Sequence, residues 1–224
     1  MSKVSLKCVK GRSRGTRSGY FSTTETGFTM IELIVVIAVV AIILSVVFFD
    51  SRGANNNLTL TNDAHLIAGA IREAQVSGQS VREVQNDDPS ITFEQRFESG
   101  YGIHFGTSAG NNTAIVYFVD LDGSGSYAGA GNTSLCTNVE CVQSISLKQG
   151  NTIHTLCGVR SDGSEECPVV SGTVDMVFKR PSTDTLMNFS FPNDGFVEAK
   201  VVIRSFSGDT KEIVVGETGY ISVQ

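Results

Sequence analysis

The chain has 224 residues, of which 41% are hydrophobic and 18% charged, with 17 basic and 23 acidic side chains. This length and apolar content allow a buried core and exclude a wholly disordered chain. The formal net charge of −6 argues against nucleic-acid binding over the whole surface.

Basic residues are concentrated at the N-terminus. Residues 1–27 contain six of the 17 basic residues and one acid, Glu25, so residues 28–224 keep 11 basic against 22 acidic residues, a formal charge of −11. Such an asymmetry indicates that the first segment has a role separate from the rest of the chain.

An apolar stretch follows this basic segment directly. Phe28–Phe49 spans 22 residues and contains one charge, Glu32. As an α-helix it would be about 33 Å long, enough to cross a hydrocarbon layer of about 30 Å. The basic flank would stay in the cytoplasm, so the C-terminal part would face outward.

Two simple interpretations of the stretch each leave a feature unexplained. A cleaved secretory signal needs a small-x-small site after the apolar run, and Val47-Phe48-Phe49-Asp50 does not supply one. A plain membrane anchor does not explain Glu32, because a carboxylate at the centre of a spanning helix costs about 2.5–3.5 kcal/mol on insertion scales.

The string Gly27-Phe28-Thr29-Met30-Ile31-Glu32-Leu33 closely resembles the processing motif of type IV prepilins and type II secretion pseudopilins. The resemblance extends over the basic leader, the Gly-Phe junction, the acid and the aliphatic run. It implies that prepilin peptidase cleaves between Gly27 and Phe28 and N-methylates Phe28. It also implies a single-pass protein of the bacterial inner membrane, with its C-terminal domain periplasmic or extracellular.

Cleavage would give the acid a partner. It would leave a cationic amine on Phe28, with Glu32 one helical turn away. In an assembled bundle, Glu32 of one subunit would pair with the Phe28 amine of a neighbour, and such a pair is strong where the dielectric constant is low. We therefore expect Glu32 to act in assembly, and Phe28–Phe49 to be a membrane anchor first and a filament core afterwards.

The apolar pattern resumes at helical spacing after a polar break. Its members are Leu60, Ala64, Ile67, Ala68, Ile71 and Ala74. We predict one long helix from about Phe28 to about Val81, weakened or kinked near Gly53 to Asn57. The predicted organisation is a cleaved leader (1–27), a transmembrane and filament-core helix (28–49), an amphipathic helix continuation with a linker (50–88) and a β-rich outer domain (89–224).

Strand-like patterns separated by Gly, Asn, Asp and Ser clusters fill the chain beyond Pro89. The candidates are Ile91–Phe97, Tyr101–Phe105, Ala114–Val119, Ser144–Leu147, Thr152–Val159, Thr173–Phe178, Leu186–Phe191, Val197–Phe206, Lys211–Val215 and Tyr220–Val223. The fold class is therefore α+β. In a pilin-like fold, a long helix has a hydrophobic protruding half and an amphipathic half, which packs on an antiparallel β-sheet or β-sandwich.

The C-terminal run Lys211–Val223 resembles the ending of the GspH/FimT branch of minor pilins and pseudopilins, which closes with two short strands around a Thr-Gly turn. That branch often carries arginines after the glycine, and some members use them to contact DNA. Here Gly219 is followed by Tyr220-Ile221-Ser222-Val223, without arginine. This departure and the charge of −11 argue against DNA as a partner.

Five cysteines are present. Cys8 lies in the leader, and the other four would face an oxidising compartment, where three pairings are open. We favour Cys136–Cys141 and Cys157–Cys167, which would staple two local loops. A zinc site is the alternative, although the Cys-x4-Cys and Cys-x9-Cys spacings differ from the common Cys-x2-Cys knuckle.

The run Asp120-Leu121-Asp122-Gly123-Ser124-Gly125-Ser126-Tyr127 follows a predicted strand. Asp120, Asp122 and Ser124 offer oxygen atoms at alternate positions, as calcium loops do. Position twelve is Gly131, where an EF-hand needs a glutamate. The alternative is an ordinary loop between strands, without any cofactor.

No catalytic constellation is evident. His65, His104 and His154 are isolated in the sequence and are expected to be structural, while Asp87-Asp88 and Glu165-Glu166 resemble solvated loop charges. Neither a Gly-x-Ser-x-Gly elbow nor a phosphate-binding glycine loop is found.

The combined prediction is a structural minor pilin or pseudopilin, not an enzyme. By the resemblance, its partners are prepilin peptidase, the inner membrane, the assembly platform and other subunits of a type IV pilus or a type II secretion pseudopilus. Two alternatives remain: a binding module displayed at a pilus tip for adhesion or DNA uptake, and an anchored periplasmic enzyme.

Overall fold

The computed structural model describes residues 27–81, 83–84, 91–129, 136, 138–168, 171–191 and 195–224. The chain divides into two compact units, Met1–Val46 and Val47–Gln224. The described part of the first unit is 27–46, and it is helical from Met30 onward.

Helix α1 runs from Met30 to Gln79, 50 residues. The backbone stays helical through residues 53–57, so the predicted weak point does not interrupt it. A glycine in a helix costs about 1 kcal/mol relative to alanine, which tertiary packing of an amphipathic segment outweighs. The helix ends two residues before the predicted limit, Val81.

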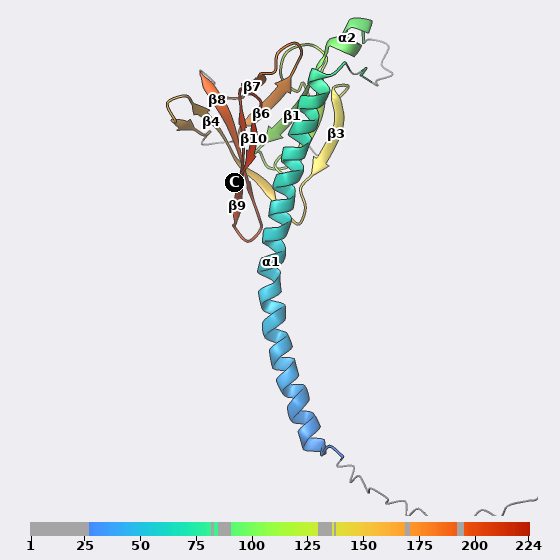
Figure 1. Ribbon diagram of the computed structural model, residues 1–224, viewed down its shortest axis with the longest axis vertical. Helices are drawn as coiled ribbons and strands as arrows, with labels where there is room; N and C mark the ends of the chain where they lie inside the picture. Colours follow the sequence, from blue (N-terminus) through green and yellow to red (C-terminus); the bar gives the residue numbers. More distant parts are fainter. Residues whose placement is uncertain are drawn as a thin grey trace, which may run out of the picture. The chain divides into compact units, whose positions relative to one another are not determined.

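The second unit contains two five-stranded sheets in which every pairing is antiparallel. The first sheet has the order β3-β2-β1-β6-β7, with β1 (Gly100–Gly106), β2 (Ala114–Asp120), β3 (Cys141–Ser146), β6 (Thr173–Phe178) and β7 (Thr185–Phe189). The second has the order β10-β9-β8-β4-β5, with β4 (Thr152–Arg160), β5 (Glu165–Glu166), β8 (Phe196–Arg204), β9 (Thr210–Gly216) and β10 (Ile221–Val223). Figure 1 shows the C-terminal part of α1 lying alongside β1 and β3.

One hydrophobic core joins this part of α1 to both sheets. The helix contributes fully buried side chains at helical spacing, including Leu60, Ile67 and Ile71. Strands of the first sheet contribute residues such as Ile103, and strands of the second contribute residues such as Ile203. One helix packed with two antiparallel sheets around a common core is the α+β, pilin-like arrangement expected from the sequence.

The first sheet is also covered on its other face. Val116, Phe118 and Val177 form a second buried cluster, against which Tyr127 and Cys141 pack. A Cβ atom on Gly102 would lie 2.8 Å from the Phe118 ring, so this strand needs glycine where that ring crosses it. Tyr127, in the described part of the connection between β2 and β3, thus covers this face of the sheet.

Two local predictions are wrong. The segment predicted as a strand over Ile91–Phe97 contains helix α2, Phe93–Glu98, because Thr92 and Gln95 form a reciprocal capping box that starts a helix. Glu165-Glu166 lies in the short strand β5 and not in a loop, although both side chains keep contact with solvent; Glu166 forms an ion pair with Arg160, and Glu165 forms one with Lys200. Asp87-Asp88 lies outside the described residues.

Candidate functional site

The start of α1 is built by Thr29. Its hydroxyl oxygen accepts a hydrogen bond from the Glu32 backbone N–H at 3.3 Å, and its carbonyl oxygen accepts one from the Leu33 N–H at 3.2 Å. Glu32 lies in the first turn, where the helix dipole favours a negative charge. The spacing Thr-x-x-Glu is that of a capping box. Sequence reasoning missed this second reason for an acid at position 32, although the pattern was readable.

Gly27 precedes that turn and is exposed. A Cβ atom placed on it would meet nothing within 4 Å, and its φ is not in the left-handed region. Neither steric crowding nor backbone conformation within the described chain therefore requires glycine here. A requirement for glycine at this position would have to come from a partner that binds the segment.

The apolar half of α1 is uncovered. Met30–Phe48 is long and apolar enough to cross a membrane, and none of this window is buried within the described chain. Burying a large aliphatic side chain such as Leu33 or Ile42 completely stabilises by about 1.5–3 kcal/mol, so the segment has a strong drive to be covered. The hydroxyl of Ser45 donates to the Ile42 carbonyl at 2.7 Å, which satisfies this polar group within the apolar stretch.

The four cysteines of the outer domain are paired as Cys136–Cys141 and Cys157–Cys167, the pairing favoured above. In the first disulfide, Cys136 lies before β3 and Cys141 is the first residue of β3. In the second, Cys157 lies in β4 and Cys167 directly follows β5. Sulfur atoms bound to each other in this way cannot act as the thiolates that zinc requires.

Two of the calcium candidates lie together, with an acid that the sequence analysis did not single out. Carboxylate oxygens of Asp120, Asp122 and Glu140 lie within 4.8 Å of one another. Asp120 and Glu140 are each only 2% exposed, whereas Asp122 is exposed. The third predicted ligand, Ser124, directs its hydroxyl to the Ser126 carbonyl at 3.1 Å.

Backbone amides hold the two buried carboxylates. The Gly125 N–H donates to Asp120 Oδ2 at 3.2 Å. Glu140 accepts from the Leu121 N–H at 3.3 Å and from the Ala128 N–H at 2.9 Å, so the residue before β3 is tied to the first part of the β2–β3 connection. Burial nevertheless raises the pKa of both Asp120 and Glu140, because it disfavours their charged forms.

Asp122 behaves differently because it is exposed. Its pKa is lowered by hydrogen bonds from Ser124, whose N–H donates to Asp122 Oδ1 at 2.9 Å. Gly131, the EF-hand position considered from the sequence, lies outside the described residues. Glu140 follows that region and directly precedes Cys141, and no spacing rule for calcium loops points to it.

His104 and Asp175 form a buried ion pair, with 2.6 Å between Nδ1 and Oδ1. The pair lines a cavity of about 320 Å³ together with Tyr127 and Asn188. Among the described residues, no serine or cysteine hydroxyl or thiol is hydrogen-bonded to His104, so the pair lacks the nucleophile of a triad. His65 and His154 are exposed.

The C-terminal strands form the expected hairpin. β9 and β10 pair antiparallel around a turn in which Gly219 has φ of 82°, a conformation that favours glycine. The Gly219 carbonyl accepts a hydrogen bond from Gln75 Nε2 at 3.1 Å, and the Glu217 carbonyl accepts one from the Thr185 N–H at 2.7 Å. The turn is therefore tied both to α1 and to β7.

Comparison with known proteins gives one match. Residues 23–48 fit the family model described as the prokaryotic N-terminal methylation motif. The comparison with curated proteins and the comparison with solved structures each found no match. The matched residues include Gly27, Phe28 and Glu32 and most of the exposed apolar helix. Together with the α+β fold, this motif indicates a type IV pilin-like or pseudopilin-like precursor, and it implies processing by prepilin peptidase and assembly with other pilin subunits.

Proposed function

We propose that the chain is a minor pilin or pseudopilin of the bacterial inner membrane, cleaved between Gly27 and Phe28 and N-methylated on Phe28. The observation that carries the proposal is the uncovered apolar window Met30–Phe48, which needs lipid before assembly and other subunits afterwards. The freedom around Gly27 supports it, because a glycine that the fold does not need is explained by recognition in a peptidase.

The proposed organisation keeps the four predicted segments. Residues 1–27 are the cytoplasmic leader, and 28–49 are the single transmembrane span and later the filament core. Residues 50–88 continue the helix, whose buried face from Leu60 to Ala74 belongs to the core of the outer domain, and 89–224 supply the sheets. The outer domain is periplasmic or extracellular, as the basic leader and the two disulfides favour.

Glu32 has a proposed role between subunits as well as within its own helix. Capping requires only a side chain that accepts a hydrogen bond, which glutamine also provides. Pairing with the Phe28 amine of a neighbouring subunit requires the negative charge. The two roles are compatible, because the same carboxylate favours the helix start before assembly and neutralises a neighbour afterwards.

We assign the chain to the GspH/FimT branch on its C-terminal hairpin. The turn around Thr218 and Gly219 is anchored to α1 through Gln75, so the ending is part of the outer-domain architecture. Tyr220 occupies the first position after the glycine, and it is partly exposed. The sequence after Gly219 therefore lacks the arginines with which some members of that branch contact DNA.

Cross-linking in living cells tests the proposal. A photo-reactive residue in place of the exposed Val36 should capture other pilin subunits in cells that assemble filaments, and should fail to do so when the assembly platform is deleted. The exposed Val142 on β3 is the matched position in the outer domain. Absence of pilin cross-links from Val36 in assembling cells, with the chain present in the membrane, would contradict the proposal.

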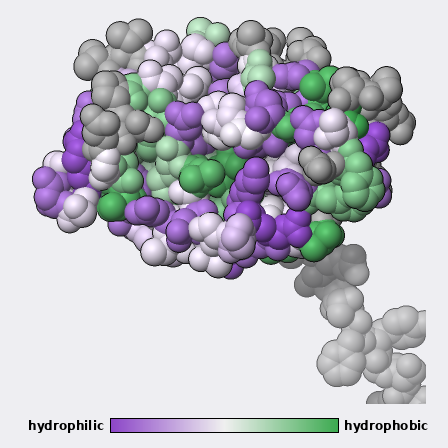
Figure 2. Space-filling view, turned by 90° about the horizontal axis from the view of Figure 1, so that it is seen from above, coloured by the Kyte–Doolittle hydropathy of each residue, from purple (hydrophilic) through white to green (hydrophobic). Residues whose placement is uncertain are grey.

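A binding module displayed at a pilus tip is the second candidate. The cavity beside His104, Asp175, Tyr127 and Asn188 favours it, because convergent polar groups in a hollow are typical of sites for small polar ligands. The outer face drawn in Figure 2 mixes hydrophilic and hydrophobic residues. Adhesion that survives assembly but is lost on replacing Asn188 with alanine would support this role, and unchanged adhesion would exclude this cavity.

A further inference from the structure

The acids after β2 concentrate negative charge around one cation, Lys179, which lines the same cavity, attracts the Asp120 carboxylate and forms no ion pair with any of the three acids. The ion pairs within the described chain are His104–Asp175, Arg160–Glu166, Lys200–Glu165 and Lys200–Glu212. None of these pairs includes Asp120, Asp122 or Glu140. Burying carboxylates without a cation or a proton is strongly unfavourable, so a neutralising partner is required.

One oxygen atom in the cluster has no hydrogen-bond donor. Asp120 Oδ2 accepts from Gly125, but Asp120 Oδ1 is buried and no described group donates to it. The residue is 2% exposed, so bulk water does not compensate. The carboxyl groups of Asp120 and Asp122 are close enough to interact directly. The free oxygen therefore belongs to a side chain that faces the other acids.

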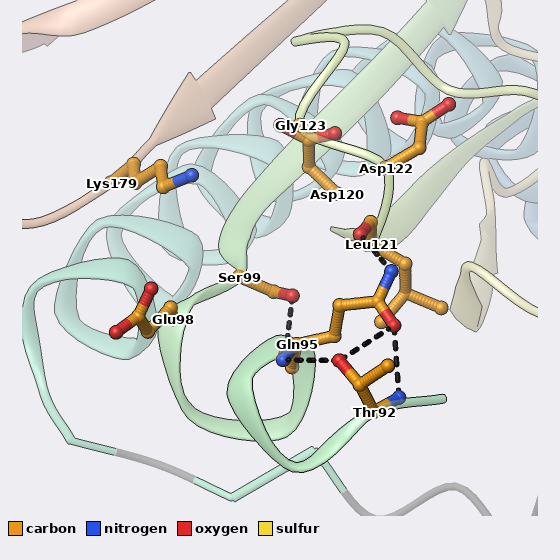
Figure 3. A pocket seen from close by; sticks show the side chains of 9 residues that line it. All are labelled: Thr92, Gln95, Glu98, Ser99, Asp120, Leu121, Asp122, Gly123 and Lys179. Atoms are coloured by element: carbon orange, nitrogen blue, oxygen red, sulfur yellow. Dashed lines mark hydrogen bonds between the residues drawn. The ribbon is translucent and has the colours of Figure 1, made fainter. Parts of the chain in front are cut away.

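The scaffold around these acids is fixed from several sides. Glu140 is held by the amides of Leu121 and Ala128 and is followed by the disulfide-bonded Cys141. Helix α2 holds the loop as well, because Gln95 Nε2 donates to the Leu121 carbonyl at 3.0 Å. Figure 3 shows Asp120, Leu121 and Asp122 on one side of a cavity of about 250 Å³ and Gln95 and Thr92 on another, with the Asp122 carboxylate pointing away from Gln95; Lys179 also lines this cavity.

We propose that Asp120, Asp122 and Glu140 bind a calcium ion. Carboxylate oxygens are the ligands that calcium prefers, and its coordination tolerates an irregular loop. Magnesium demands near-ideal octahedral geometry and retains several waters, which suits this arrangement poorly. The donor set differs from the one read from the sequence, since Glu140 replaces Ser124. Asp120 is the buried anchor, Asp122 the exposed ligand, and Glu140 the link to β3.

Calcium at this position would order the connection between β2 and β3. Tyr127 lies in that connection and packs on Phe118 and His104, at ring-centroid distances of 5.4 and 5.2 Å. The charge of Glu140 contributes to raising the pKa of Tyr127, after burial, so the phenol lies within electrostatic reach of the cluster. The ion would thus stabilise the layer that covers the outer face of the first sheet.

Thermal unfolding of the full-length chain in detergent tests the proposal. An outward-facing module binds calcium with a dissociation constant of about 0.1–1 mM. A tenfold excess of calcium over that constant should raise Tm by roughly 3–6 °C, and magnesium at equal ionic strength should not. If a proton shared between Asp120 and Asp122 neutralises the cluster instead, Tm will not respond to calcium, and the proposal fails. An equal response to magnesium also overturns it.

The chain contains a matched control for the variants. Asp162 forms the same type of turn as Asp122, with its Oδ1 accepting from the Ser164 N–H at 2.8 Å, but no metal-binding cluster among the described residues includes it. Asp122→Asn should weaken calcium binding at least tenfold, and Asp162→Asn should leave it unchanged. Equal losses in both variants would show that the turns, and not a metal, account for the effect.

Terbium provides a direct signal that does not depend on stability. The chain has 5 tyrosines and no tryptophan, so terbium luminescence excited through tyrosine reports a lanthanide bound nearby. Three results would support the site: calcium displaces the terbium and lowers the luminescence, Glu140→Gln abolishes the luminescence, and Tyr127→Phe reduces it. Luminescence that persists at full strength in the Glu140→Gln variant would overturn it. The leader, its processing and the assembly of the chain are not involved in either test.

Discussion

The hydroxyl oxygen of Thr29 accepts a hydrogen bond from the backbone N–H of Glu32 at 3.3 Å, at the first turn of the apolar helix. The residue proposed to pair with a neighbouring subunit is therefore also the third residue of a helix that Thr29 caps. The observed bond involves only the backbone N–H of Glu32, so capping by its side chain is an expectation separate from charge pairing, and substitution distinguishes the two.

Replacing Glu32 with glutamine should impair filament assembly about as much as replacing it with alanine. Glutamine keeps the hydrogen-bonding capacity of a capping box and removes only the charge. Both variants should still enter the membrane, since the apolar stretch is unchanged. The measurement is the ratio of the amount of each variant in sheared filaments to its amount in membranes, compared with the parent protein. Normal assembly with glutamine, and poor assembly with alanine, would assign Glu32 to capping alone.

Replacing Gly27 with alanine should block removal of residues 1–27 without altering the fold. No described atom lies within 4 Å of the added Cβ atom, so Tm of the precursor should stay within 1 °C or so of the parent value. Electrophoretic migration with co-expressed prepilin peptidase measures the processing. Mature-sized Gly27→Ala protein would show that glycine is not recognised there.

The buried face of α1 should carry the stability of the outer domain. Ile71 is fully buried, and its replacement with alanine should lower the free energy of unfolding by about 2–5 kcal/mol. Val76 on the same helix is 63% exposed, and its replacement with alanine should change the free energy by less than about 0.5 kcal/mol. Denaturant unfolding of the full-length chain measures both. Equal effects would contradict the packing of the helix on the sheets.

Removing the Cys157–Cys167 disulfide should destabilise the second sheet at its β4–β5 edge. The bond closes a loop with a sequence separation of 10, for which chain entropy gives about 2–3 kcal/mol. The double variant with alanine at both positions should therefore unfold at a lower denaturant concentration, and reductant should lower the midpoint of the parent protein. A midpoint insensitive to both changes would show that the pair contributes no stability.

The periodic spacing of apolar residues in the sequence is sufficient to predict much of the fold. The spacing of Leu60, Ile67 and Ile71 identified the buried helix face, and alternation along β8 identified a half-buried strand. Both patterns arise because a regular helix or strand buries one side, so apolar residues recur along the sequence at the period of that element. A long helix or strand that packs against one core can therefore be predicted from the spacing of its apolar residues.

Other features depend on contacts that consecutive residues do not record. Helix α2 is an exception, because its six residues are too few for helical periodicity but the Thr92-x-x-Gln95 capping box that starts it is readable in the sequence. Strand β5 is defined by its pairing with β4 and by the ion pair from Glu165 to Lys200 on β8, a partner 35 residues away. Glu140 meets Asp120 because β2 and β3 pair antiparallel with Phe118 opposite Cys141, which places the residue before β3 beside the end of β2.

Intact-mass analysis of the chain from its native host tests the central claim most directly. The account predicts a mature polypeptide that begins at Phe28 and carries one added methyl group on its terminal amine, recovered from the filament fraction. A native chain that retains residues 1–27, or that begins at any residue other than Phe28, would contradict it.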